Sequence, residues 1–193
     1  MKNYKSILIQ TTLILVFMIG AISCTDNKPE DTKVIALESN EEKFDDNKNE
    51  KDAKFLVNAA EINMEEVNLG KLAQQKGTLK SVKELGKMME DAHSKSLNDL
   101  IALAKSKNMT LPTSTTNDAM DDYKKMNDKS ASDFDKEYSE KMVKDHKNAV
   151  DLFEKAANDG NDSDIKAWAS NTLPTLRKHL EQAEMCKKES DNK

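Results

Sequence analysis

The residues of this chain that are best suited to chemistry are its three histidines and two of its glutamates. His93, His146 and His179 each lie on the apolar stripe of a different predicted helix, near the middle of that helix. Glu66 lies on the stripe of a fourth predicted helix, and Glu90 lies one turn before His93, at the edge of the same stripe. These positions lie at similar distances along the helices from the connections that join them. Glu66 is expected within about one helical turn of the level of His93.

Imidazoles and carboxylates that meet in the middle of a helical bundle are ligands for iron, manganese or zinc. The sequence therefore predicts a candidate metal site made of Glu66, Glu90, His93, His146 and His179. A second interpretation stays open. A pair of Glu66 with His93, together with histidines bound by threonine or tyrosine hydroxyls, would satisfy the buried polar groups without a metal.

Four amphipathic helices are needed to hold these residues, at about residues 53–76, 79–107, 131–159 and 163–187. Their apolar residues recur at intervals of three, four or seven, which is the spacing of one helix face. The turns at residues 77–78 and 158–161 are short, so we expect two antiparallel helix hairpins. The connection over residues 107–130, with a possible short helix at 117–126, is long enough to cross the length of a bundle. The predicted fold is all-α: a four-helix bundle of two hairpins joined by a long crossover.

The composition agrees with a solvated helical domain. Of the 193 residues, 37% are hydrophobic and 34% are charged, and five glycines with three prolines are too few for the frequent turns of a β-sandwich. The formal net charge is −5 and the sequence has no basic stripe with interleaved aromatic residues, which argues against nucleic-acid binding. Nucleophilic catalysis is poorly supported, because there is no glycine-rich elbow and Cys186 has no obvious activator.

The N-terminus has the features of an export signal. Lys2 and Lys5 precede an apolar run at residues 7–19, which small residues follow. The next residues, Ala21-Ile22-Ser23-Cys24, resemble the lipobox of bacterial lipoproteins, which implies cleavage before Cys24 and lipidation of that cysteine. An ordinary cleavable signal with a chance cysteine is the alternative.

These features divide the chain into a lipoprotein signal peptide at 1–23, an acidic flexible tether at 24–51 and a helical domain at 52–189. The tether is expected because its composition is acidic and poor in large apolar residues. We expect the protein to be exported to the bacterial cell envelope and held to a membrane by the lipid on Cys24, at the outer membrane or facing the periplasm.

Four blocks of sequence, in order, resemble the domain-of-unknown-function 4142 family: EVNLGKLA at 66–73, MEDAH at 89–93, MVKDH at 142–146 and TLPTLRKHL at 172–180. The resemblance covers about residues 53–188. It implies a ferritin-like four-helix fold, usually in exported or lipid-anchored bacterial proteins, with no established activity. The chain departs from the family where Ala92 separates Asp91 from His93.

The match to the di-iron site of ferritin-like proteins is partial. Glu66 fits the glutamate of the first helix, and Glu90 with His93 fits the Glu-x-x-His motif of the second. The third helix has His146 in place of a glutamate, and the fourth has Leu176 where a carboxylate should precede His179. We therefore predict a non-enzymatic structural or binding module. The alternative is a metal-binding ferritin-like oxidoreductase or storage protein.

Overall fold

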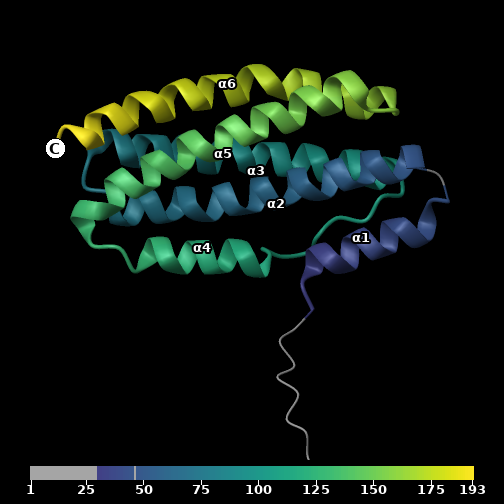
Figure 1. Ribbon diagram of the computed structural model, residues 1–193, viewed down its shortest axis with the longest axis horizontal. Coiled ribbons are helices and arrows are strands. Elements are labelled where there is room, and N and C mark those ends of the chain that lie inside the picture. Colours follow the sequence, from purple (N-terminus) through teal and green to yellow (C-terminus); the bar gives the residue numbers. More distant parts are fainter. Residues whose placement is uncertain (1–29, 46) are drawn as a thin grey trace, which may run out of the picture.

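The computed structural model describes residues 30–45 and 47–193, and this part of the chain is helical without any strand (Figure 1). Its six helices are α1 (Thr32–Lys43), α2 (Asn47–Lys76), α3 (Lys80–Ser106), α4 (Asn117–Asn127), α5 (Ala131–Asp159) and α6 (Ser163–Asp191). The four helices predicted from the apolar stripes are α2, α3, α5 and α6, and the short helix expected at 117–126 is α4. The predicted signal peptide and Cys24 lie outside the described residues.

The four long helices form two hairpins that lie side by side (Figure 1). Residues 77–79 join α2 to α3, and residues 160–162 join α5 to α6. Between the hairpins, α3 packs on α6 and α2 packs on α5, while the shorter α1 and α4 both pack on α2. These short connections produce antiparallel hairpins, because after a turn of a few residues the next helix must pack alongside the first in the opposite direction.

The two helices of the first hairpin touch at their backbones. A Cβ atom added to Gly86 would lie 2.7 Å from the Cβ of Ala73 and 2.7 Å from the carbonyl oxygen of Gly70. Both distances are far below the ordinary carbon contact of about 3.5–4.0 Å, so only glycine fits at this crossing of α2 and α3.

Each hairpin turn is bound by a buried carboxylate from the other hairpin. Asp135 of α5 accepts hydrogen bonds from the backbone N–H groups of Thr78 (2.9 Å) and Leu79 (3.1 Å), at the start of α3. Asp52 of α2 accepts from the N–H of Asp162 (2.7 Å), just before α6. Each carboxylate satisfies N–H groups that a helix start leaves without an intrahelical partner, and in doing so it fixes one hairpin against the other.

The apolar core consists of two clusters on either side of a polar layer. One cluster, which includes Leu56, Leu100, Phe153 and Ile165, is built from the N-terminal half of α2 and the parts of the other long helices beside it. The second, which includes Phe134, is built from the opposite ends of the same four helices. On every long helix, the histidine or glutamate predicted for the site lies between the residues of the two clusters.

For the described residues of the predicted tether, 30–45 and 47–51, the structure corrects the expectation of a flexible segment. Residues 32–43 form α1, and α2 begins at Asn47 rather than near residue 53. Asp31 caps α1 by accepting from the N–H of Lys33 (2.9 Å), and the buried Asn40 exchanges two hydrogen bonds with the backbone of Thr110 (2.8 and 2.7 Å). This segment is ordered by polar contacts with the crossover and by the burial of Ala36, not by a large apolar face of its own.

Among the described residues, no helix is both long and apolar enough to cross a membrane.

Candidate functional site

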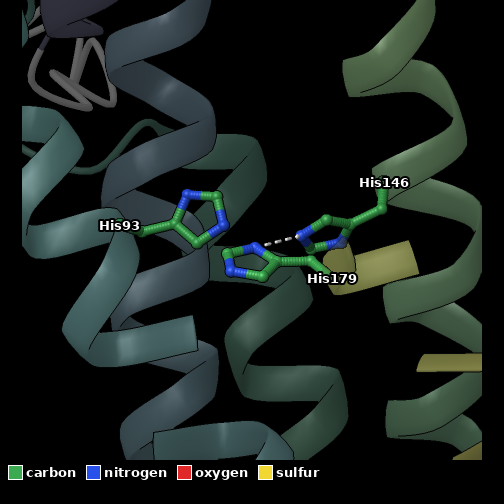
Figure 2. A group of neighbouring side chains, drawn as sticks. All are labelled: His93, His146 and His179. Carbon is green, nitrogen blue, oxygen red and sulfur yellow. Dashed lines mark hydrogen bonds between the residues drawn. The ribbon is translucent and has the colours of Figure 1, made fainter. Parts of the chain in front are cut away.

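The three histidines predicted for the site meet at the centre of the domain (Figure 2). His93 comes from α3, His146 from α5 and His179 from α6, and each is only 1–3% exposed. The ring centroids of the three pairs lie 5.3–5.6 Å apart. One nitrogen can be chosen from each ring such that all three lie within 4.8 Å of one another.

Two of the rings are linked directly. Nε2 of His146 lies 3.3 Å from Nδ1 of His179, and Nδ1 of His146 lies 3.0 Å from the carbonyl oxygen of Met142. Because that carbonyl can only accept, Nδ1 of His146 carries the proton and Nε2 carries a lone pair. It follows that His179 donates from Nδ1 to His146 in the neutral protein.

The third ring is oriented by α2. Nδ1 of His93 lies 2.9 Å from Oδ1 of Asn63, and the amide nitrogen of Asn63 donates to the carbonyl of Ala59 (2.8 Å). This second bond fixes which end of the amide faces the histidine, so Nδ1 of His93 is the donor. Nε2 of His93 is then left with a lone pair, is fully buried and has no hydrogen-bond partner among the described residues.

Burial keeps the three imidazoles neutral. It lowers the pKa of His93 well below the ordinary value, with further lowering from the neighbouring His146 and His179. Burial also lowers the pKa of His146, against the opposing effects of the Met142 carbonyl and of Asp145. For His179, burial and the nearby His146 and Lys178 lower the pKa to about 3.

Glu66 lies beside this group but outside the triangle of rings. Its Oε1 is 3.9 Å from Nδ1 of His146, which is the ring nitrogen that binds the Met142 carbonyl. Burial raises the pKa of Glu66 well above the ordinary value, and repulsion from Asp145 and Glu65 adds to this effect. The lowered pKa of His146 and the raised pKa of Glu66 both disfavour an ion pair between the two side chains.

The structure separates Glu90 from the predicted site. Its carboxylate accepts a hydrogen bond from Nε2 of Gln74 (2.7 Å) and lies 3.9 Å from Nζ of Lys71, both on α2. The other predicted contact is also different, because His93 binds Asn63 and not Glu66. Cys24, the predicted lipidation site, lies outside the described residues.

Sequence reasoning missed Asn63, which follows Ala59 by four residues and precedes Glu66 by three. That spacing places it on the same helix face as both, so an amide on an otherwise apolar stripe was the available signal. It also missed Tyr138, whose hydroxyl is buried without a hydrogen-bond partner among the described residues. Burial and the nearby Glu66 raise the pKa of this tyrosine well above its usual range.

The space beside the histidines is small. A cavity of about 20 Å³ borders His93 and His179 and is lined in part by Ser96, Thr172 and Thr175. One water molecule needs about 10–15 Å³ measured in this way, so the cavity has room for about one. Three buried imidazoles with such a cavity could hold a metal ion with a bound water, but they could not admit an organic molecule.

Residues 38–186 match the family described as Domain of unknown function (DUF4142). Neither the comparison with curated proteins nor that with solved structures gives a match.

Proposed function

The chain belongs to the DUF4142 family, and we propose that it is a non-enzymatic binding module of the bacterial cell envelope, held to a membrane by lipid on Cys24. In this proposal the four long helices are a ferritin-like four-helix bundle. Two antiparallel hairpins joined by the long connection between α3 and α5 support that assignment, because ferritin-like bundles have one such crossover.

The observation that carries the binding role is the enclosed polar layer. Among the described residues, the set of three histidines is the one group of His, Cys, Asp or Glu side chains close enough together to hold a metal ion, and the cavity beside it holds about 20 Å³. Sites for small organic ligands are clefts of about 300–1,000 Å³. A depression of that size, about 410 Å³, lies between the start of α2 and the end of α5 and is lined by Phe55 and Leu152, not by a histidine. A centre closed in this way suits the capture of a small ligand better than the turnover of an organic substrate.

The alternative, an iron, manganese or zinc oxidoreductase or storage protein, has weaker support. Its carboxylate ligands are not assembled, since Glu90 binds Gln74 and Glu66 lies at the far edge of the His146 ring. The group of three imidazoles is the feature that supports metal binding in this alternative.

The envelope assignment is tested by cell fractionation. We expect the native chain in the membrane fraction and the Cys24→Ser variant in the soluble fraction, because the lipid is the only anchor in the proposal. Cys186→Ser is the matched control, since Cys186 is buried and 2% exposed and should leave the fractionation unchanged. A Cys24→Ser protein that has lost residues 1–23, as N-terminal sequencing shows, and still stays with the membrane would refute the lipid anchor.

A further inference from the structure

We infer that His93, His146 and His179 form a binding site for one four-coordinate divalent transition metal ion of the zinc type. The ligand atoms are Nε2 of His93, Nε2 of His146 and Nδ1 of His179. The inference rests on the proposed function and deepens it, because it names the class of ligand that the binding module takes.

The surroundings of His93 and His146 each leave one ring nitrogen free to bind a metal. Asn63 and the Met142 carbonyl occupy Nδ1 of His93 and of His146, which leaves both Nε2 atoms with free lone pairs. Metal-bound histidines usually donate their other nitrogen to such an oxygen, which fixes the tautomer and the ring direction. Figure 2 shows a nitrogen of His93 facing the other two rings. That nitrogen is the buried Nε2, which otherwise has no partner in the described part of the chain.

The spacing of the ring nitrogens is close to that of a tetrahedral metal site. In a tetrahedral site with Zn–N bonds of 2.0–2.1 Å, two ligand nitrogens lie about 3.3 Å apart. Nε2 of His146 and Nδ1 of His179 already have this separation, 3.3 Å. One nitrogen can be chosen from each of the three rings such that all lie within 4.8 Å of one another, so movements of about 1.5 Å or less bring the set to tetrahedral spacing.

Binding needs a change of tautomer in one ring and no change in charge. In the metal-free protein the proton on Nδ1 of His179 bridges to Nε2 of His146. When the metal binds, Nδ1 of His179 releases this proton to solvent and Nε2 of the same ring takes one up, so the ring stays neutral and both nitrogens of the pair present lone pairs to the metal. His146 and His93 keep the tautomers that they already have.

The ligand type selects the metal. Three imidazole nitrogens without a carboxylate suit zinc, cobalt, nickel or copper, whereas magnesium, calcium and manganese prefer oxygen ligands. The two glutamates predicted from the sequence are not ligands in this site. Glu90 binds Gln74, and Glu66 lies beside Nδ1 of His146, which is not the nitrogen that would bind the metal. A water molecule is the expected fourth ligand, and the 20 Å³ cavity that borders His93 and His179 has room for about one.

The test uses the full chain, purified in detergent without a histidine tag, stripped with a chelator and then given Zn²⁺ or Co²⁺. We expect one Zn²⁺ per chain after desalting, a higher melting temperature, and with Co²⁺ the strong visible absorption of a four-coordinate complex. His93→Gln and His179→Gln should each abolish stoichiometric binding. Asn63→Ala should weaken binding by about 10–100-fold, as for other residues that orient a ligand.

Glu90→Gln and Glu66→Gln are the matched controls and should leave stoichiometry and the Co²⁺ spectrum unchanged; a loss in either would refute this ligand set. If a histidine variant fails to fold, zinc uptake by the native chain still tests the proposed site. No uptake and no change in melting temperature at millimolar Zn²⁺ would overturn the site. Zinc binding and membrane attachment are tested by separate experiments. The fractionation of the Cys24→Ser protein reports on the lipid anchor, whether or not the protein binds zinc.

Discussion

Mild acid should destabilise the metal-free domain, because folding holds three imidazoles in the neutral form. The ordinary pKa of histidine is about 6.5, and the folded protein lowers the pKa of His93, His146 and His179, to about 3 for the last. Below pH 6.5 the unfolded chain therefore binds more protons than the folded one. Stability is fully present above pH 6.5 and is lost as the pH falls.

The size of the effect follows from counting protons. Each histidine that stays neutral contributes a slope of about 1.4 kcal/mol per pH unit below its unfolded pKa. Glu66 acts in the opposite direction, because its pKa is raised from 4.5 and its folded form keeps a proton that the unfolded chain has lost. His179, whose pKa falls to about 3, contributes a loss of about 1.6 kcal/mol between pH 6.5 and pH 5. The lowered pKa values of His93 and His146 add to this loss, and the raised pKa values of Glu65 and Glu66 offset part of it. Asp135, whose pKa lies below its ordinary 3.8 despite burial because of its Thr78 hydrogen bonds, acts only in stronger acid.

The assay is urea unfolding, followed by circular dichroism, of a chain shortened to residues 30–193, at pH 7.5, 6.5, 5.5 and 5.0 with a chelator present. The loss of about 1.6 kcal/mol from His179 alone is a measurable part of the 5–15 kcal/mol that stabilises a typical domain. His179→Gln is the control and should reduce the slope by about 1.4 kcal/mol per pH unit. Equal free energies of unfolding at pH 6.5 and pH 5, or an unchanged slope in the variant, would refute neutral burial of the histidines.

Three further predictions concern unfolding free energies measured in urea. Gly86→Ala should lower stability by about 1–3 kcal/mol, because the new Cβ would meet Ala73 at 2.7 Å; an unchanged value would mean that α2 and α3 can separate. Asp135→Ala should cost about 1–3 kcal/mol by leaving the Thr78 N–H unpaired, and Asp133→Ala on the exposed first turn is its control. Glu66→Gln should stabilise the domain at pH 7.5 and less so at pH 5, since glutamine needs no proton uptake; equal effects at both pH values would contradict a protonated Glu66.

The sequence predicts the long helices well because their apolar residues repeat with the helix period and their ends carry turn residues. The helix expected at 131–159 is α5 with the same bounds, and the reversals at 77–78 and 158–161 fall where the hairpins turn. Where the pattern is weak, prediction fails. α1 has few large apolar residues and is ordered by Asn40 and Asp31, whose partners lie far away in the sequence at Thr110 and Asn117.

The site was predicted in part for the same reason. Helix period and distance from the turns place His93, His146 and His179 at one depth, and the structure brings them together. The same arithmetic could not place Glu90, because it lies at the edge of its stripe, where a small rotation of α3 decides which neighbour the side chain meets. That neighbour is Gln74. The pattern of side chains along a sequence carries no information on backbone carbonyls, so the contact of the Met142 carbonyl with His146 could not be predicted.

The polar layer is costly to the fold, and that cost points to a role for it. Nε2 of His93, Oε2 of Glu66 and the hydroxyl of Tyr138 are all buried without a hydrogen-bond partner in the described residues. Each such atom costs about 1–3 kcal/mol, whereas apolar residues of similar volume would join the two clusters into one continuous core. A metal at the three histidines would satisfy one of these atoms directly, and its binding energy would stabilise the folded state. Metal binding at the inferred site would therefore offset part of the cost of this layer.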